Sequence, residues 1–249
     1  MFTNAGIYEP CGIFTIGHFI LIAFTVIGIL ISLKFSANKD KNTVYKIIKY
    51  TTIIACILEV FRITYNIKLY SIKEVNTYMP LYYCSIFLYA GLLSSFGKGN
   101  LKRAGDVCLA TGSIIGGIIF IIYPSTTLPT YPAFHILSIH SFLFHGSMVY
   151  LGILIAKTEY INLKLSDAKY FAVLIGLMGI VALFINNTLG GNLMFLSETF
   201  FVFPINLIYN LTNGGILFSL IMLAVQMTLP FYFCYFIIFG CVKNHNSNY

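Results

Sequence analysis

The chain has 249 residues, of which 58% are hydrophobic and 9% are charged, and its mean hydropathy is +0.86. Soluble domains carry about a quarter charged residues, so this composition excludes a soluble globular fold and predicts one all-α, polytopic membrane domain over residues 1–249. The formal net charge is +7, but the basic residues fall in short connections between apolar stretches, so we expect no nucleic-acid partner.

Seven apolar stretches follow one another, each close to the roughly 17–25 residues that a membrane-spanning helix needs. They cover residues 13–33, 47–67, 79–96, 104–123, 133–156, 170–185 and 214–239. We expect the third helix to open at Pro80, since proline is tolerated in a first helical turn, and the last helix to be kinked at Pro230. The segment 186–213 is polar and rich in Phe, Gly and Asn, which predicts a re-entrant or interfacial piece.

The basic residues predict the orientation. Lysines and arginines follow the first, third, fifth and seventh stretches, whereas the N-terminal segment and the connections 124–132 and 186–213 contain none. Only Lys68 and Lys73 lie on the other side. This alternation is the positive-inside pattern of a protein with its N-terminus outside and its C-terminus in the cytoplasm. We therefore expect a multi-pass protein of a cell membrane, without a cleavable signal peptide.

Two opposite charges lie within the second stretch. Ionisable side chains inside a span cost at least a few kcal/mol each and usually face the interior of the bundle. Glu59 and Arg62 are three residues apart, so they are neighbours on one helix and can neutralise each other. This spacing favours a structural ion pair, and the alternative is that Glu59 orients a catalytic or substrate group.

The six cysteines form no CxxC pair, which argues against a disulfide framework or a zinc site. Cys84 is distinctive because it lies near the start of the third stretch. A cysteine within a membrane is usually a small buried hydrophobe. A helix N-terminus, however, favours a thiolate, so Cys84 is a candidate nucleophile if a base lies nearby.

The fifth stretch supplies candidate bases in His135, His140 and His145. At about 100° per residue, His145 shares a stripe with Ser141, His135 lies about 80° away, and His140 lies nearly opposite. Three histidines so arranged cannot ligate one metal from one face, so we expect no metal site and no cofactor. A lone histidine within a membrane is usually structural, but three of them interleaved with serines predict a polar chamber.

Three short motifs occur in the order that marks a known family. The first is Pro80-Leu81 with Cys84, the second is Phe142-Leu143 with His145-Gly146, and the third is Gly190 or Gly191 with Asn192 and Met194-Phe195-Leu196. In these residues the chain resembles the YwaF family of bacterial membrane proteins, which is similar to the eukaryotic transmembrane protein 164. It departs from the family at Leu193, where many relatives have Tyr, and at Ser197-Glu198, which replaces a common Lys-Pro.

The resemblance implies a seven-helix membrane acyltransferase of the bacterial plasma membrane, with membrane phospholipids as substrate. Cys84 would be the nucleophile and His145 the base, and Asn192 and Asn187 would be polar pocket residues. An imidazole-activated thiol can attack an acyl ester, form a thioester and pass the acyl group to an alcohol. Oxyanion donors could come from Asn192, Ser85 or Ser141. With the N-terminus outside, the three motifs converge on the outer half of the bundle.

Two other functions remain open. The chain could be a small transporter or channel in which Glu59, Arg62 and His135 line a polar path, or a non-catalytic membrane scaffold. The sequence has no inverted repeat and no clear pair of broken helices, and the absence of both argues against transport.

Overall fold

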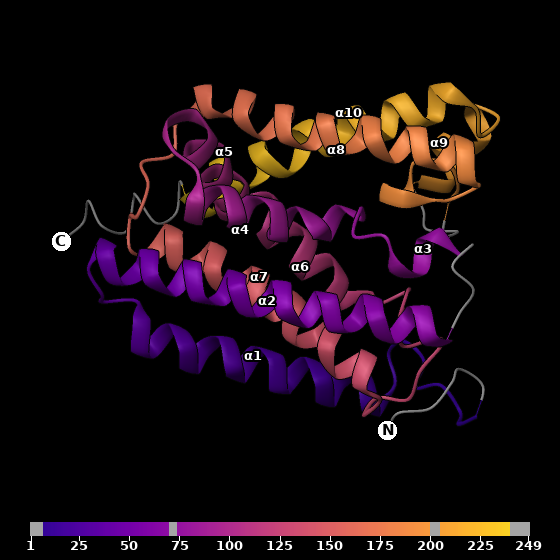
Figure 1. The fold of residues 1–249 in the computed structure, drawn as a ribbon, viewed down its shortest axis with the longest axis horizontal. Coiled ribbons are helices and arrows are strands. Elements are labelled where there is room, and N and C mark those ends of the chain that lie inside the picture. Colours follow the sequence, from indigo (N-terminus) through magenta and orange to yellow (C-terminus); the bar gives the residue numbers. More distant parts are fainter. Residues whose placement is uncertain (1–6, 70–73, 200–204, 240–249) are drawn as a thin grey trace.

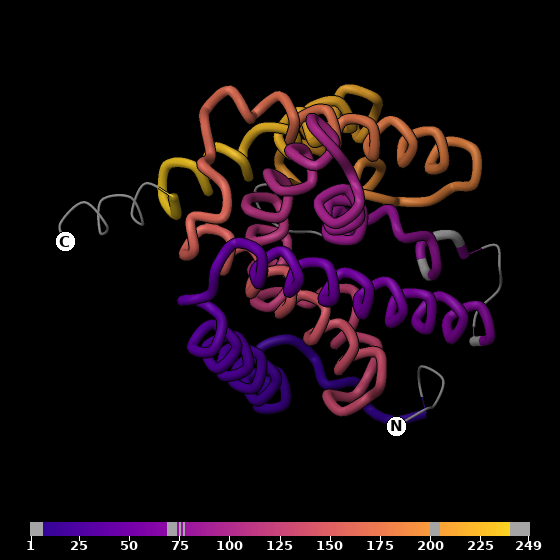
Figure 2. Tube along the Cα trace, turned by 60° about the vertical axis from the view of Figure 1, so that its left-hand side comes forward, coloured from indigo at the N-terminus to yellow at the C-terminus, as the bar shows by residue number. Residues whose placement is uncertain are grey.

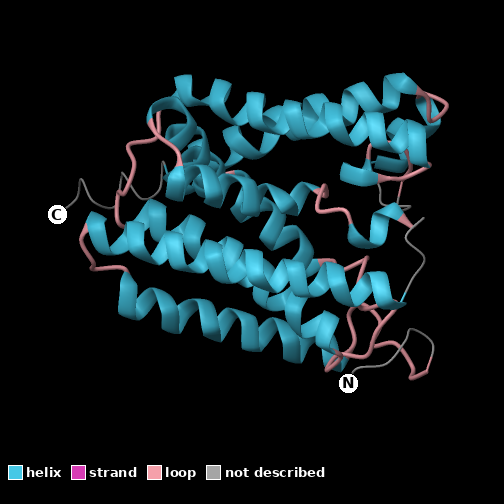
Figure 3. Cartoon of the chain, in the orientation of Figure 1, coloured by secondary structure: helices cyan, strands magenta, loops and turns pink. Residues whose placement is uncertain are grey.

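The protein is an all-helical bundle in the computed structural model, which describes residues 7–69, 74–199 and 205–239. No strand occurs within these ranges (Figure 3). The longest helices follow the long axis of the molecule (Figure 1). The α-helices are α1 Ile16–Ser36, α2 Lys41–Leu69, α3 Val75–Tyr78, α4 Ile86–Phe96, α5 Gly99–Ala110, α6 Gly112–Ile122, α7 Ile136–Lys157, α8 Ala168–Leu189, α9 Ile205–Leu211 and α10 Ile216–Phe233. Short 3₁₀ turns are η1 Tyr83–Ser85, η2 Leu165–Asp167 and η3 Leu193–Phe195, and a π-helical segment, η4, covers Cys234–Phe239.

Five helical segments in the described part of the chain are long and apolar enough to cross a membrane, so the chain is a multi-pass membrane protein. They are Ile16–Ser36, Gly99–Ile122, Ile136–Lys157, Leu165–Leu189 and Ile216–Phe239. The other two predicted spans also contain helices. Helix α2 has 29 residues but is more polar, and the apolar helix Tyr83–Phe96 is shorter than a full crossing. The predicted number of seven spans thus stays a prediction.

The third predicted span begins later than Pro80. The backbone is still extended at Tyr82, with φ −78° and ψ 162°, and helix begins only at Tyr83. The Pro80 carbonyl accepts a hydrogen bond from the Tyr89 hydroxyl at 2.8 Å, which ties the extended segment to the first turn of α4. Pro80 therefore lies before the helix instead of inside its first turn, and the prediction placed this boundary wrongly.

The fourth predicted span is two helices, α5 and α6, that meet at Thr111. The Thr111 hydroxyl donates to the carbonyl of Val107 at 2.7 Å, a side-chain bond that competes with the helical backbone pattern. Thr111 itself has φ −126° and ψ −79°, outside the helical region. The next residue is Gly112, where a β-carbon would lie 2.6 Å from the Phe171 ring. The missing side chain at Gly112 therefore allows the Phe171 ring of α8 to approach closely.

The last predicted span is irregular near its proline. Pro230 removes a backbone donor from α10, and the α-helix changes to a π-helix at Cys234. The Cys234 thiol donates to the Thr111 carbonyl at 3.3 Å, so the irregular segment of α10 contacts the break between α5 and α6. The fourth and last predicted spans thus each depart from a regular α-helix, and their irregular segments contact each other.

The connections separate into two groups by position. Those joining α1 to α2, α4 to α5 and α7 to α8 lie at the left end in Figure 1, and those following α6 and α8 lie at the right end. The lysine-rich connections thus share one end of the bundle. Polar bonds brace this end: Lys102 bonds Asp106 at 2.9 Å, and Arg103 pairs with Asp167. The Ser94 hydroxyl joins α4 to this network through Asp106.

Helix α7 is the centre of the core, whereas α1 lies at its edge. At Gly117 of α6 a β-carbon would lie 2.8 Å from the His145 carbonyl oxygen, so α6 and α7 touch backbone to backbone. Helix α1 buries only four residues, and one of them is His18. The His18 ring accepts from the Phe14 amide at 3.1 Å and donates from Nε2 to the Ile121 carbonyl at 3.0 Å, which fastens α1 to the end of α6.

Helices α8 and α10 run beside each other on the side of the bundle away from α1 (Figure 2). Helix α8 continues to Leu189, past the predicted end at residue 185, and stops at Gly190 with a left-handed φ of 69°. The predicted re-entrant or interfacial segment therefore starts later than expected, and residues 200–204 within it lie outside the described ranges.

Candidate functional site

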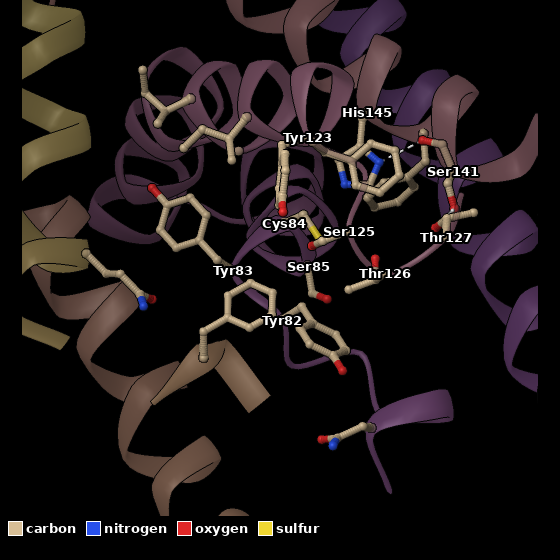
Figure 4. A pocket seen from close by; sticks show the side chains of 18 of the residues that line it. Tyr82, Tyr83, Cys84, Ser85, Tyr123, Ser125, Thr126, Thr127, Ser141 and His145 are labelled. Carbon is tan, nitrogen blue, oxygen red and sulfur yellow. Dashed lines mark hydrogen bonds between the residues drawn. The ribbon is translucent and has the colours of Figure 1, made fainter. Parts of the chain in front are cut away.

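A cavity of about 810 Å³ lies within the bundle, between α2, η1, α6, α7 and α10. Small-molecule sites occupy roughly 300–1,000 Å³, so it is large for a single small metabolite. Cys84 and His145, the predicted nucleophile and base, both lie on its wall and face inward (Figure 4). Four more predicted site residues line it: Glu59, Arg62, His140 and Ser141.

Cys84 is positioned by the residue before it. The Tyr83 side chain fills the space that Gly112 and Gly116 leave on α6, where a β-carbon at Gly116 would lie 3.2 Å from the Tyr83 ring. This packing fixes the η1 turn, and Cys84 in the middle of that turn directs its partly exposed side chain to the cavity. The turn leads directly into α4, so Cys84 lies at a helix N-terminus, as predicted.

His145 is held in one orientation. Its Nδ1 atom lies 2.7 Å from the carbonyl oxygen of Ser141, which can only accept, so the proton is on Nδ1. The ring also stacks on Phe120, with centroids 3.7 Å apart and planes 9° apart. In the neutral imidazole Nε2 then carries the lone pair, and this buried atom has no hydrogen-bond partner among the described residues. The arrangement suits a proton acceptor.

The cavity-facing side of α7 is broader than the sequence suggested. Its lining residues are Leu137, His140, Ser141, Phe144 and His145. Their spacing of three and four residues is that of one helical face. The helix angle between the two histidines, about 140°, puts them at the two edges of that face. His140 therefore shares the cavity with His145, although helical geometry had predicted nearly opposite sides.

Glu59 and Arg62 form the predicted ion pair, and they do so at the cavity wall. The Arg62 Nε atom donates to Glu59 Oε2 at 2.9 Å, and Nη2 donates to Oε1 at 2.6 Å. Two parallel bonds of this kind define the orientation of both groups. The pair leaves this part of the wall polar but with no net charge.

Three predicted site residues do not line the cavity. His135 is buried before the first residue of α7, where its Nδ1 accepts from the Leu137 amide at 3.2 Å and its ring stacks on Tyr131. Asn187 is exposed on α8. The Asn192 amide bonds the backbone of Ser197 and Glu198, so it shapes the loop instead of facing the cavity. None of the three is among the residues that line the cavity.

The third motif instead brings Phe195 to the wall. The neighbours Met194 and Phe195 both have left-handed backbones, with φ of 54° and 56°. Buried Asn186 supports this strained turn by bonding both the amide and the carbonyl of Leu193, at 2.8 and 3.1 Å. As a result, Phe195 lines the cavity and contacts the Tyr82 ring, with centroids 5.4 Å apart. Strained backbone of this kind often lies at functional sites.

Two of the polar features that line the cavity were missed by the sequence reasoning. One is the hydroxyl-rich connection after α6, with Ser125, Thr126, Thr127 and Thr130. Its position in a connection without Lys or Arg, next to the histidine-bearing stretch, was an available signal. The other is Gln226 of α10, the only glutamine in the chain, whose Nε2 bonds the Met194 carbonyl at 2.8 Å. No sequence signal identified Phe120 as the ring that stacks on His145.

Comparison with known proteins identifies a family. The model of the TMEM164 family matches residues 13–225, a range that includes all three motifs. No curated protein and no solved structure matches the chain. The match covers most of the sequence and agrees with the similarity to transmembrane protein 164, while the YwaF name stays a prediction. The chain belongs to the TMEM164 family.

Proposed function

We propose that the chain is a membrane-embedded lipid acyltransferase in which Cys84 is the nucleophile and His145 the base. The observation that carries this proposal is the unpartnered Nε2 of His145 in a cavity that Cys84 also lines. A buried thiol stays neutral unless a base takes its proton. The Ser141 carbonyl keeps the second ring nitrogen protonated, so Nε2 is the nitrogen able to act as that base.

In the first step, His145 Nε2 takes the Cys84 proton as the sulfur attacks the acyl carbonyl carbon of a phospholipid ester. The tetrahedral intermediate collapses by breaking the bond to the glycerol oxygen. That oxygen receives the proton from Nε2 and leaves as the lysolipid hydroxyl, while the acyl group stays on sulfur as a thioester. The imidazole returns to its starting form.

In the second step, the hydroxyl of an acceptor lysolipid gives its proton to His145 Nε2 and its oxygen attacks the thioester. The sulfur leaves and recovers the proton. Both intermediates need an oxyanion donor. Ser141 is suited to this role because its oxygen accepts from the Thr127 hydroxyl at 3.4 Å, which leaves its own proton to donate. Ser85, next to the nucleophile on the cavity wall, is a second donor.

The orientation of the chain bears on where this reaction occurs. The lysine-rich connections share one end of the bundle, and the positive-inside rule assigns that end to the cytoplasm. The hydroxyl-rich connection after α6 and the η3 turn lie toward the other end. We therefore propose that the reaction occurs in the outer half of a bacterial plasma membrane, in a seven-span topology with the N-terminus outside.

The test uses purified protein in vesicles that contain one phospholipid donor and a lysophospholipid acceptor with a different headgroup. We expect acyl transfer, detected by mass spectrometry, and an acyl adduct on Cys84 that hydroxylamine removes. Cys84→Ala abolishes both. His145→Gln lowers the transfer rate by about 10²–10⁴-fold, the usual contribution of a general base.

Cys56→Ala is the matched control, because Cys56 is also a partly exposed cysteine of the bundle but does not line the cavity. It is expected to transfer acyl groups at the wild-type rate. Transfer by Cys84→Ala at that rate, or an adduct on another cysteine, would exclude the mechanism.

One observation favours transport as a second candidate function. The irregular segment of α10 contacts the break between α5 and α6, through Cys234 and Thr111. Paired discontinuous helices are typical of secondary transporters. Release of a small polar solute from vesicles containing the Cys84→Ala protein, at the wild-type rate, would favour this function over acyl transfer.

A further inference from the structure

The cavity has two chemically different ends. Near the connection after α6, its wall is hydroxyl-rich, with Ser125, Thr126 and Thr127. Between α6 and α10, the wall consists mostly of aliphatic side chains, including Ile115, Ile119, Met222, Val225 and Leu229. A ligand that fills both ends must have a polar part and a long apolar part.

The aliphatic end is open to the side of the bundle. Ile119 and Leu229 line the cavity, yet 59% and 56% of their surfaces are exposed. Both lie in segments that are long and apolar enough to cross a membrane, Gly99–Ile122 and Ile216–Phe239. The surroundings at that depth are hydrocarbon. The cavity is therefore continuous with the lipid-facing surface between α6 and α10.

The opening has defined limits. At one end the Cys234 thiol bonds the Thr111 carbonyl and joins α10 to the start of α6. Helix α10 is also fixed to the η3 turn, by Gln226 on Met194 and by Ser219 on the Leu196 carbonyl at 2.6 Å. The gap between α6 and α10 is thus closed at one end by a bonded contact, α10 is fixed by its bonds to η3, and Met222 in the interior is 6% exposed.

We propose that the gap between α6 and α10 is a lateral portal through which a lipid acyl chain enters the cavity directly from the bilayer, with Ile119 and Leu229 as its rim. Entry of the acyl chain does not depend on the proposed function. Only the reaction that follows entry rests on it. An acyl chain is the occupant because it is the apolar ligand that surrounds the opening at membrane depth. The chain lies along the aliphatic wall, and its carboxyl end reaches the region of Cys84.

The first experiment measures occupancy without catalysis. Cys84→Ala protein is placed in phosphatidylcholine vesicles with a phospholipid that carries a photoreactive diazirine in its acyl chain. We expect adducts at buried cavity residues such as Met222, besides those on outward-facing residues. Leu229→Trp removes the Met222 adducts, and Leu177→Trp does not. Leu177 is the matched control because it is a leucine of α8 that is 58% exposed and does not line the cavity.

Adducts confined to outward-facing residues in the Cys84→Ala protein would overturn the portal, and so would Met222 adducts that persist in Leu229→Trp. This readout needs no turnover, so it can fail while the acyl-transfer test succeeds, or the reverse. A failure of the portal and a failure of the proposed function are therefore distinguishable.

The second experiment compares two acyl donors in the otherwise wild-type protein. Leu229→Trp is expected to slow transfer from a long-chain phospholipid by roughly tenfold relative to Leu177→Trp. A tenfold loss corresponds to excluding about two methylene groups of the acyl chain from the apolar opening. Acetylation of Cys84 by a short, water-soluble acetyl thioester is expected to be unchanged, because the acetyl group has no tail to pass through the rim. An equal loss with both donors would overturn the portal.

Discussion

The contact between α6 and α7 at Gly117 supports a quantitative prediction, because it holds His145 in place. A methyl group at position 117 would lie 2.6 Å from Val149 Cγ2 and 2.8 Å from the His145 carbonyl oxygen. Optimal separations between nonbonded carbons are about 3.5–4.0 Å. Gly117→Ala therefore forces the two helices apart by roughly 0.5–1 Å, a gap that forfeits a quarter to a half of the dispersion attraction across the contact.

Overpacking of this kind costs about 1–3 kcal/mol. Alanine also stabilises a helix relative to glycine by up to about 1 kcal/mol. The control variant must therefore contain the same glycine-to-alanine change at a position without a close contact. Gly28→Ala provides it, since Gly28 also lies within a helix but has nothing within 4 Å of its added β-carbon. We expect Gly28→Ala to match or exceed the wild-type stability and Gly117→Ala to be less stable than Gly28→Ala by about 1–3 kcal/mol.

The assay is thermal and denaturant unfolding of the purified variants in detergent, followed by far-ultraviolet circular dichroism because the chain contains no tryptophan. Movement of α7 also displaces His145 from the Phe120 ring, and a displacement of about 1 Å can lower the rate of the proposed acyl transfer by about 100-fold. Equal stability of the Gly117→Ala and Gly28→Ala proteins would refute the close contact between α6 and α7.

Three further predictions concern the hydrogen bonds of individual side chains. Each is tested by measuring the free energy of unfolding of the variant in detergent. Asn186→Ala should cost about 1–3 kcal/mol because it leaves the Leu193 amide and carbonyl unpaired, whereas exposed Asn187→Ala should stay within about 0.5 kcal/mol of wild type; similar losses from both would contradict the bracing of η3. His18→Phe should cost about 1–3 kcal/mol, since a phenyl ring cannot bond Phe14 and Ile121, and a neutral result would count against the fastening of α1 to α6. Tyr83→Phe should be neutral or stabilising by about 1 kcal/mol, because the buried Tyr83 hydroxyl has no partner in the described residues; a marked loss would mean that this hydroxyl is bonded.

The hydropathy of the sequence and the lengths of its apolar stretches were enough to locate the helices. A membrane helix must form its backbone hydrogen bonds internally and present apolar side chains outward. The same reasoning misplaced the breaks. Thr111 lies within a strongly apolar stretch, and the helix is interrupted at the point where Phe171 of another helix packs against Gly112. Helix boundaries that depend on a neighbouring helix cannot be read from one stretch of sequence.

For the candidate site, the motifs identified Cys84 and His145, and both line one cavity. The third motif was interpreted by chemistry alone, which favoured Asn192 as a pocket residue. Its amide bonds the backbone of its own loop, and the neighbouring left-handed turn presents Phe195 instead. Residue type does not reveal whether a polar group faces a ligand or its own backbone, since an amide can bond either equally well.

The proposed side opening between α6 and α10 has a consequence for how the concentration of a lipid ligand is defined. A ligand that enters from the membrane plane is encountered by diffusion in two dimensions, so its abundance is a mole fraction of the surrounding lipid. Adding inert lipid to the vesicles would then lower the rate at which the ligand enters the cavity, whereas adding buffer would leave that rate unaltered. Local composition of the leaflet, including any lateral separation of lipids into domains, would set its output more directly than the total amount of lipid in the cell.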